Sequence, residues 1–581
     1  MQTNVEKLIN NSIGTRKSRL GRYYNIVIIK LLKRILYVER INKFTDEHSH
    51  LDEKHFISEL FEYLNFSYLI SNRDLQKIPS EGKLICVANH PIGSLDSLCL
   101  LKAVLEIRSD VRIVANEILT NIGHFNRLIL PVKLDSKGPQ KTNILAIHKA
   151  LEEEKAVIIF PAATVSRLKG IQIEDSKWNK GAVHFAKIFN APVLPIFINA
   201  KNSFLFYLVS VINKRLSSLL LAHELFNKKN RTIQIKIGDL IPAKAFHSSC
   251  INDTVQAKLL KKHVYLIGKN KKGIYTTEKN VIHPVDRKAI KSELNKVNLL
   301  GITNDNLKIY LTNRTDSPHS LNEIARLREI TFRKVGEGTG KNLDLDKYDS
   351  YYKHLIIWDD KDLEIIGSYR IGSGKEISNQ FGKNGFYTSS LFNYSDEFKN
   401  EIASHSIELG RSFVQKKYWN SNALNYLWQG IGAYLASDSS IKYMFGGVSI
   451  SNSYPENIRE AIVYYFNKWY GNKYKLAQSR RQYFLDEKKN DHFNQIFTGI
   501  TPKEDYKTLK QLLKPFGLTI PILYKHYSDL CEEGGVKFLD FGVDPDFENC
   551  VDGLILVDVD MIKEEKRQKY INKFQKTAIL N

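Results

Sequence analysis

Residues 84–96 read Leu-Ile-Cys-Val-Ala-Asn-His-Pro-Ile-Gly-Ser-Leu-Asp, and this stretch decides the fold of the N-terminal half. Its first five residues are uniformly apolar, as in a buried parallel strand, and a helical apolar spacing begins at residue 95. His90 therefore follows a strand, and Asp96 lies in the first turn of a helix. A His so placed can act as a general base, and an Asp beside it can fix its tautomer. Taken alone, the two residues also fit an ordinary turn.

Strand and helix patterns alternate outward from this stretch, from about residue 82 to residue 245. Such alternation predicts a largely parallel or mixed sheet with covering helices. We expect strands at 84–88, 111–115, 128–132, 156–160, 193–198 and 232–241, with helices such as 95–107 and 143–153. The polar, lysine-rich stretch from about 264 to 306 indicates a domain boundary. A second unit follows, with a strand at 307–311, a helix at 319–332 and paired strands at 354–358 and 365–371.

The predicted fold class is therefore α/β, with two α/β domains. A chain of 581 residues is also too long for a single hydrophobic core. We predict an N-terminal segment at 1–45, a first domain at 46–265, a linker at 266–305 and a second domain at 306–581.

The net charge of +22 implies a polyanionic partner, namely nucleic acid, an anionic membrane or an acidic carrier protein. The five cysteines show no zinc or C-x-x-C spacing, so we predict reduced thiols and no metal site. No apolar run reaches the length of a membrane span, and no cleavable signal peptide is visible. The best candidate, residues 204–212, is cut short by Asn213, Lys214 and Arg215.

The first 45 residues combine apolar and basic positions. Tyr24, Ile28, Leu31, Ile35 and Val38 recur at helical spacing, with lysines and an arginine between them. This pattern predicts a basic amphipathic helix suited to an anionic lipid interface. It also fits a helix packed on its own domain with a solvated basic face.

The N-terminal motifs occur in a specific order. After His90 and Asp96 come Val-Ala-Asn-Glu-Ile at 114–118, Phe-Pro-Ala-Ala-Thr-Val-Ser-Arg at 160–167 and Ala-Pro-Val-Leu-Pro at 191–195. Together they resemble the glycerolipid acyltransferase superfamily, typified by lysophosphatidic acid acyltransferases. The resemblance implies that His90 deprotonates an acceptor hydroxyl, which attacks an acyl thioester. It also implies that Arg167 grips an anionic group.

The third of these blocks departs from the family pattern. Its usual Gly and acidic residue are replaced by Ala163 with Ala162 or Thr164. Those positions normally shape the acceptor site. The departure leaves open an altered acceptor, or an N-terminal domain that serves only as a membrane-docking module.

The C-terminal half carries a second ordered set of polar residues. Singly, each fits a surface charge or an ion pair. The set comprises Arg328 and Phe332, then Asp344, Asp346, Asp349 and His354, then Gly367 and Arg370, and finally Glu408 and Arg411.

Together these residues resemble the GNAT branch that contains acyl-homoserine-lactone synthases and ornithine-lipid N-acyltransferases. The resemblance implies a core whose splayed strands admit the pantetheine arm of the donor, and acylation of an amino acid's α-amine. Carboxylates such as Asp346, Asp349 or the catalytic Glu408 would hold the amine or lead its proton away. Arginines 328, 370 and 411 would pair with a carboxylate or a phosphate, beside Phe332. The resemblance also implies that the domain has no bound cofactor and that acyl carrier protein or coenzyme A carries the thioester.

The order of the two domains resembles the bifunctional ornithine-lipid synthases of bacteria. That resemblance implies N-acylation of ornithine by a 3-hydroxyacyl thioester in the C-terminal domain, and then O-acylation of the new hydroxyl in the N-terminal domain. It places the chain on the cytoplasmic face of the inner membrane, as a peripheral or monotopic protein. Glycine or another amino acid remains an alternative head group. Nucleic acid is disfavoured as a partner, because no helix-turn-helix, zinc-finger or RNP-type motif is visible.

Overall fold

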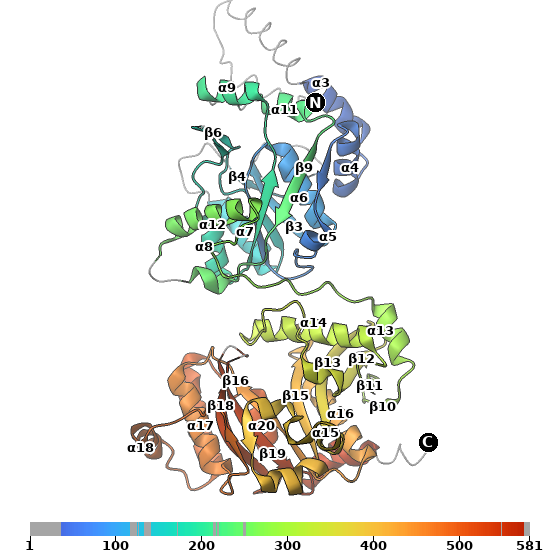
Figure 1. The fold of residues 1–581 in the computed structure, drawn as a ribbon, viewed down its shortest axis with the longest axis vertical. Helices are drawn as coiled ribbons and strands as arrows, with labels where there is room; N and C mark the ends of the chain where they lie inside the picture. Colours follow the sequence, from blue (N-terminus) through green and yellow to red (C-terminus); the bar gives the residue numbers. More distant parts are fainter. Residues whose placement is uncertain are drawn as a thin grey trace, which may run out of the picture. The chain divides into compact units, whose positions relative to one another are not determined.

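The computed structural model describes residues 37–116, 125, 127–132, 141–170, 172–212, 217, 220–247, 251–545, 547 and 549–574. Most of the predicted basic segment at 1–45 therefore lies outside the described residues. The chain divides into two compact units, Met1–His283 and Pro284–Asn581 (Figure 1). None of the helices within the described ranges is both long and apolar enough to cross a membrane.

The first unit is built on a seven-stranded sheet with β2 (Leu84–Ala88) near its centre. All five residues of β2 are buried, which explains its continuous apolar sequence. The strand order is β1 (Ser67–Leu69), β9 (Thr232–Ile237), β8 (Val193–Asn199), β2, β5 (Ala156–Ile159), β3 (Val111–Asn116) and β4 (Ile129–Val132). Strand β2 pairs in parallel with β5 and β8, whereas β8 and β9 are antiparallel.

Helices cover both faces of this sheet. One apolar core joins the sheet to α4 (Glu53–Tyr63) and α6 (Ser94–Leu105). The other joins it to α7 (Lys141–Glu152), α8 (Gly181–Ile188) and α12 (Asp253–Gly268). The first unit is thus an α/β layered domain, as predicted.

The second unit contains an eight-stranded sheet. Its order is β10 (Leu299–Ile302), β11 (Lys308–Thr312), β12 (Lys353–Asp359), β13 (Glu364–Ser373), β15 (Ser406–Val414), β16 (Tyr443–Ile450), β19 (Cys550–Asp558) and β18 (Val536–Asp544). Neighbouring strands are antiparallel except β15 and β16. Strands β15 and β16 pair in parallel only from Ser406 to Glu408. Beyond Glu408, β15 continues to pair with β13, and β16 continues to pair with β19. The sheet is therefore splayed in its middle.

The stretch expected to be a linker, 266–305, differs from that expectation. It contains helix α13 (Arg287–Leu294), which buries Ile290 and Leu294 beside α14 (Pro318–Lys334). It also contains β10, which pairs with β11. Because α13 has only one narrow apolar side and several exposed basic residues, its sequence reads as polar.

Candidate active sites

The N-terminal site lies where β2 ends and α6 begins. Asp96 is fully buried in the first turn of α6, and its Oδ1 lies 3.1 Å from His90 Nδ1. Its Oδ2 accepts hydrogen bonds from the backbone N–H groups of Ile92 and Gly93, at 2.8 and 3.1 Å. The helix start thus holds the carboxylate against the imidazole, as the sequence predicted for this pair. Burial lowers the pKa of His90, but the carboxylates of Asp96 and Asp175 outweigh it and raise this pKa above its usual value.

Asp175 supports the same site, although no motif pointed to it. It is fully buried after β7 (Gln172–Glu174), and its Oδ1 accepts hydrogen bonds from the backbone N–H of His90 at 3.2 Å and from Ser166 Oγ at 2.6 Å. Trp178 Nε1 donates to its other oxygen at 2.9 Å. The backbone N–H of Ser166 donates to the carbonyl of His90 at 2.8 Å. The third sequence block is therefore tied directly to the His90 motif.

The altered third block has a visible conformational consequence. Ala163, which stands where the family has glycine, adopts φ of 56°. A side chain in this left-handed region is strained, and glycine adopts it freely. The backbone turn is thus retained without the glycine that normally makes it.

Arg167 begins β6 (Arg167–Lys169), one residue after Ser166. Its Nη1 hydrogen-bonds to Ser217 Oγ, and its guanidinium lies 4.7 Å from the ring centre of Phe206. The structure therefore places Arg167 beside helix α9 (Phe204–Ile212), where it is partly buried. Its proposed contact with an anionic group remains a prediction.

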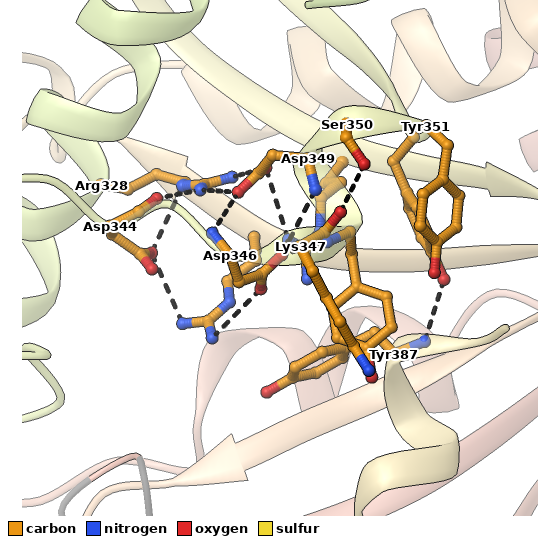
Figure 2. Close-up of polar contacts among 12 residues, drawn as sticks. Arg328, Asp344, Asp346, Lys347, Asp349, Ser350, Tyr351 and Tyr387 are labelled. Carbon is orange, nitrogen blue, oxygen red and sulfur yellow. Dashed lines mark hydrogen bonds and ion pairs between the residues drawn. The ribbon is translucent and has the colours of Figure 1, made fainter. Parts of the chain in front are cut away.

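The C-terminal motif residues converge on a buried ion-pair network. Figure 2 shows Arg328 from α14 beside Asp344 and Asp349. Its Nη1 and Nη2 each donate to an oxygen of Asp349 at 3.0 Å, and its Nε lies 3.3 Å from Asp344 Oδ2. Burial raises the pKa of Asp349, but the charges of Arg328 and Arg370 outweigh it and hold that pKa well below the usual range.

Two further arginines complete this network. Arg370 Nη1 donates to Asp346 Oδ1 at 2.7 Å, and Arg411 Nη1 donates to Asp344 Oδ2 at 3.4 Å. Arg370 is 1% exposed, and its Nη2 has no hydrogen-bond partner among the described residues. Asp346 Oδ2 likewise lacks a hydrogen-bond partner in that part of the chain, although Arg411 Nη2 lies 3.8 Å away. One buried donor and one buried acceptor of this cluster thus make no hydrogen bond to the described residues.

Phe332 packs against an aromatic neighbour of these charges. Its ring meets Phe547 at 5.2 Å, and the guanidinium of Arg411 lies 4.7 Å from the centre of the same Phe547 ring. The predicted substrate-binding residue therefore supports the network through an aromatic neighbour.

Glu408 lies at the last position where β15 pairs with β16, and it forms no recorded ion pair with the three arginines among the described residues. Its carboxylate accepts hydrogen bonds from the hydroxyls of Tyr352 and Thr388 and from the backbone N–H groups of Tyr387 and Thr388. Burial raises its pKa despite these bonds. The guanidinium of Arg370 lies 5.2 Å from the Tyr352 ring and 5.1 Å from the Tyr387 ring, so tyrosines connect Glu408 to the network. With four donors bound, Glu408 positions these groups, and its predicted catalytic role is untested.

Two buried carboxylates that no motif marked lie near Arg411. Glu337 accepts from Ser449 Oγ at 3.2 Å, and burial raises its pKa to about 7. Asp552 lies opposite Ser449 across the β16–β19 pair, and burial raises its pKa to about 8, with the Asp544 and Glu337 charges adding to the effect. Glu337 follows α14 and Asp552 lies on β19, far apart in the sequence and outside any motif, so only the fold brings them together.

Family comparisons agree with this architecture. Residues 12–272 match a family described as Acyltransferase, and residues 327–429 match the Acetyltransferase (GNAT) domain. The predicted α/β fold class is therefore confirmed, with one domain of each type.

Three curated relatives are similar to the chain. "Glycine N(alpha)-acyltransferase" of Phocaeicola vulgatus is 34% identical over 51% of this chain and 94% of its own length. "Lyso-glycine lipid O-acyltransferase" of the same organism is 27% identical over 42% of this chain and 93% of its own length. "L-ornithine N(alpha)-acyltransferase" of Agrobacterium fabrum is 29% identical over 24% of this chain and 48% of its own length. The chain is therefore an acyltransferase, and it belongs to the family of the bacterial glycine N(alpha)-acyltransferases.

Proposed function

We propose that this chain makes a diacylated amino-acid membrane lipid in two steps. The GNAT domain acylates the α-amine of an amino acid with a 3-hydroxyacyl thioester. The N-terminal domain then acylates the hydroxyl of that chain. The order follows from the chemistry, because the second acceptor hydroxyl arrives with the first acyl group.

The first step rests on one observation: the buried network contains a donor and an acceptor that make no hydrogen bond to the described residues. Arg370 Nη2 can donate to the carboxylate of an amino acid, and Asp346 Oδ2 can accept from its amine. The amine nitrogen attacks the thioester carbonyl, the amide bond forms, and the C–S bond breaks. The amine loses one proton and the leaving thiolate gains one, so the exchange balances.

The second step rests on the His90–Asp96 pair. The imidazole Nε2 takes the proton of the lyso-lipid hydroxyl as its oxygen attacks the second thioester. Asp96 faces Nδ1, so it favours the tautomer with a basic Nε2 and stabilises the imidazolium that forms. That proton then passes to the departing thiolate. An intact His–Asp pair favours an active domain over a mere docking module.

Glycine is the head group that the relatives favour. Two relatives from one organism, named for glycine N-acylation and for lyso-glycine lipid O-acylation, are each matched over more than nine-tenths of their length. Joining both activities in one chain would keep the intermediate near its second site.

Ornithine remains a second candidate because of Glu337 and Asp552. A side-chain ammonium could neutralise these buried carboxylates, whose pKa values burial raises. The donor in either case is an acyl carrier protein or coenzyme A thioester, and the net charge of +22 suits an acidic carrier and an anionic membrane surface. We propose the cytoplasmic face of the bacterial inner membrane as the place of action.

A competition assay tests the identity of the head group. Purified full-length protein is incubated with glycine and ornithine at equal concentration and a 3-hydroxyacyl thioester, and mass spectrometry identifies the products. We expect N-acylglycine to dominate in wild type and in Asp552→Asn. If ornithine dominates in wild type and falls selectively in Asp552→Asn, the second candidate replaces the first. No N-acyl product from either amino acid would contradict the proposal.

A further inference from the structure

Helix α9 carries an uncovered apolar face. Its outward residues lie at positions i, i+1, i+4, i+7 and i+8, which is one side of a helix. They are between 48% and 81% exposed, although all are large and apolar. These residues are Phe204, Leu205, Leu208, Val211 and Ile212. A cluster of this kind on a surface marks an interaction site, because isolated apolar residues are common and grouped ones are not.

The opposite side of α9 is fixed to the O-acylation site. Phe206 and Tyr207 are buried in a small core with Val165, the residue before Ser166. Asn202, which precedes the helix, donates from Nδ2 to the carbonyl of Pro91 at 3.3 Å, and its N–H donates to the hydroxyl of Tyr207 at 3.0 Å. Figure 1 shows α9 at the border of the first unit, near β6. Whatever covers the outer face is therefore held beside the His90 motif.

The sequence on both sides of α9 is basic. Between Asp175 and Glu224 the sequence has no acidic residue, and it has six lysines and arginines. Lys201, three residues before α9, is exposed. Basic residues that flank an apolar helical face match a bilayer with anionic headgroups, since the cations meet phosphates while the apolar side chains enter the acyl layer.

We propose that α9 inserts its outer face into an anionic bilayer and thereby sets the O-acylation site at the lipid surface. The role of this insertion rests on the proposed function, because a lyso-lipid acceptor would reside in that bilayer; the insertion itself does not. Helix α9 has nine residues, so it lies along the interface. The five side chains leave water together, and each contributes to binding in proportion to its buried area.

A fluorescent label tests this placement without using the enzyme's activity. An environment-sensitive dye is attached to Val211→Cys in the full chain, and the matched control carries it at Ile500→Cys, an exposed apolar position in the second unit. The probe membranes are vesicles of phosphatidylcholine with about one quarter phosphatidylglycerol. We expect a blue shift and quenching by lipids with quenchers on their acyl chains for the label at 211, and neither for the label at 500.

A substitution gives the second readout. Leu208→Asp with Val211→Asp should weaken vesicle binding at least tenfold, because two apolar side chains no longer leave water on binding and two carboxylates would have to enter the acyl layer. The control Phe484→Asp with Ile500→Asp, on exposed residues of the second unit, should bind as wild type does.

Several results would overturn the proposal. The first is an unshifted label at 211 on vesicles that bind the protein. The second is equal binding by the α9 variant and the wild type. A shift that appears without lipid, on raising protein concentration or adding an acidic carrier protein, would assign the face to a protein partner. If the label at 211 enters the bilayer but the wild-type protein makes no acylated amino-acid lipid, the proposed function is wrong and the membrane contact of α9 stands.

Discussion

Replacing Asp96 by Asn tests the chemistry of the N-terminal site most sharply. The amide oxygen can still accept from the N–H groups of Ile92 and Gly93, so the helix start is kept. The amide nitrogen must then face His90 Nδ1 in place of the carboxylate oxygen, which lies 3.1 Å from it. An N–H donor there favours the tautomer with the proton on Nε2, and that imidazole cannot accept the proton of the acceptor hydroxyl.

The size of the effect follows from what the variant removes. General base catalysis contributes about 10²–10⁴-fold, so we expect kcat for O-acylation to fall by that factor, or about 3–5 kcal/mol in the barrier. The free energy of unfolding should fall by only about 1 kcal/mol, because the hydrogen bonds from Ile92 and Gly93 are kept and only their acceptor becomes neutral.

The pH profile provides a second, independent signature. His90 must be neutral to act as a base, so activity rises as pH passes its pKa. In wild type the carboxylates raise this pKa. Without the Asp96 charge, the opposing effect of burial gains weight, and the acidic limb of kcat/KM moves to lower pH while the plateau falls.

The assay follows thioester cleavage with a lyso-lipid acceptor in mixed micelles, across a range of pH. Ser97→Ala is the matched control, because it removes only the long hydrogen bond of 3.4 Å from Ser97 Oγ to Asp96 Oδ1 and keeps the carboxylate charge that faces His90. It should keep activity within about twofold. If Asp96→Asn keeps more than a third of wild-type activity, or its acidic limb stays in place, the base assignment is wrong.

Three further predictions concern stability. Ala163→Gly should stabilise the first unit by about 1 kcal/mol, since φ of 56° suits glycine, and chemical denaturation would detect it; a loss of stability would contradict this. Asp349→Ala should destabilise the second unit by about 3–5 kcal/mol, because it leaves Arg328 buried without its bidentate partner; an unchanged denaturation midpoint would refute that. The folded pKa of Asp552, about 8, exceeds its unfolded value, so its contribution is full below pH about 4 and is lost as pH rises to about 8. Unfolding free energy should therefore fall between pH 5 and 9 by less in Asp552→Asn than in wild type, and equal falls would contradict this sign.

Much of the fold was predictable because its central strands are buried on both sides. Strand β2 is apolar throughout, and the His90–Asp96 pair follows it directly. The position of this pair at the strand–helix junction could therefore be predicted from its place in the sequence. Helix α13 was missed because it is short and buries only Ile290 and Leu294. Strand β10 was missed because it lies at the edge of its sheet and is only partly buried.

The candidate sites were predictable where their residues share a motif. Arg328, Asp349 and Arg370 belong to one motif set, and the structure brings them together. Asp175 lies 85 residues from the backbone N–H that it accepts from, and nothing in its local sequence marks it. The motif set included Glu408, but a motif could not reveal the four donors around its carboxylate.

The central claim is that one chain performs two acyl transfers in sequence at two separate sites. The most direct test is mass spectrometry of total lipids from a bacterium without aminolipids that expresses wild type, His90→Ala, Asp346→Asn, or both variants as separate chains. We predict a diacylated glycine lipid from wild type, its lyso form from His90→Ala, and at least about tenfold less of both lipids from Asp346→Asn, because this variant loses the charged contact to Arg370. The two variants together should restore the diacylated lipid. A diacylated lipid that persists in His90→Ala, or no new lipid from folded wild type with its substrates present, would contradict the claim.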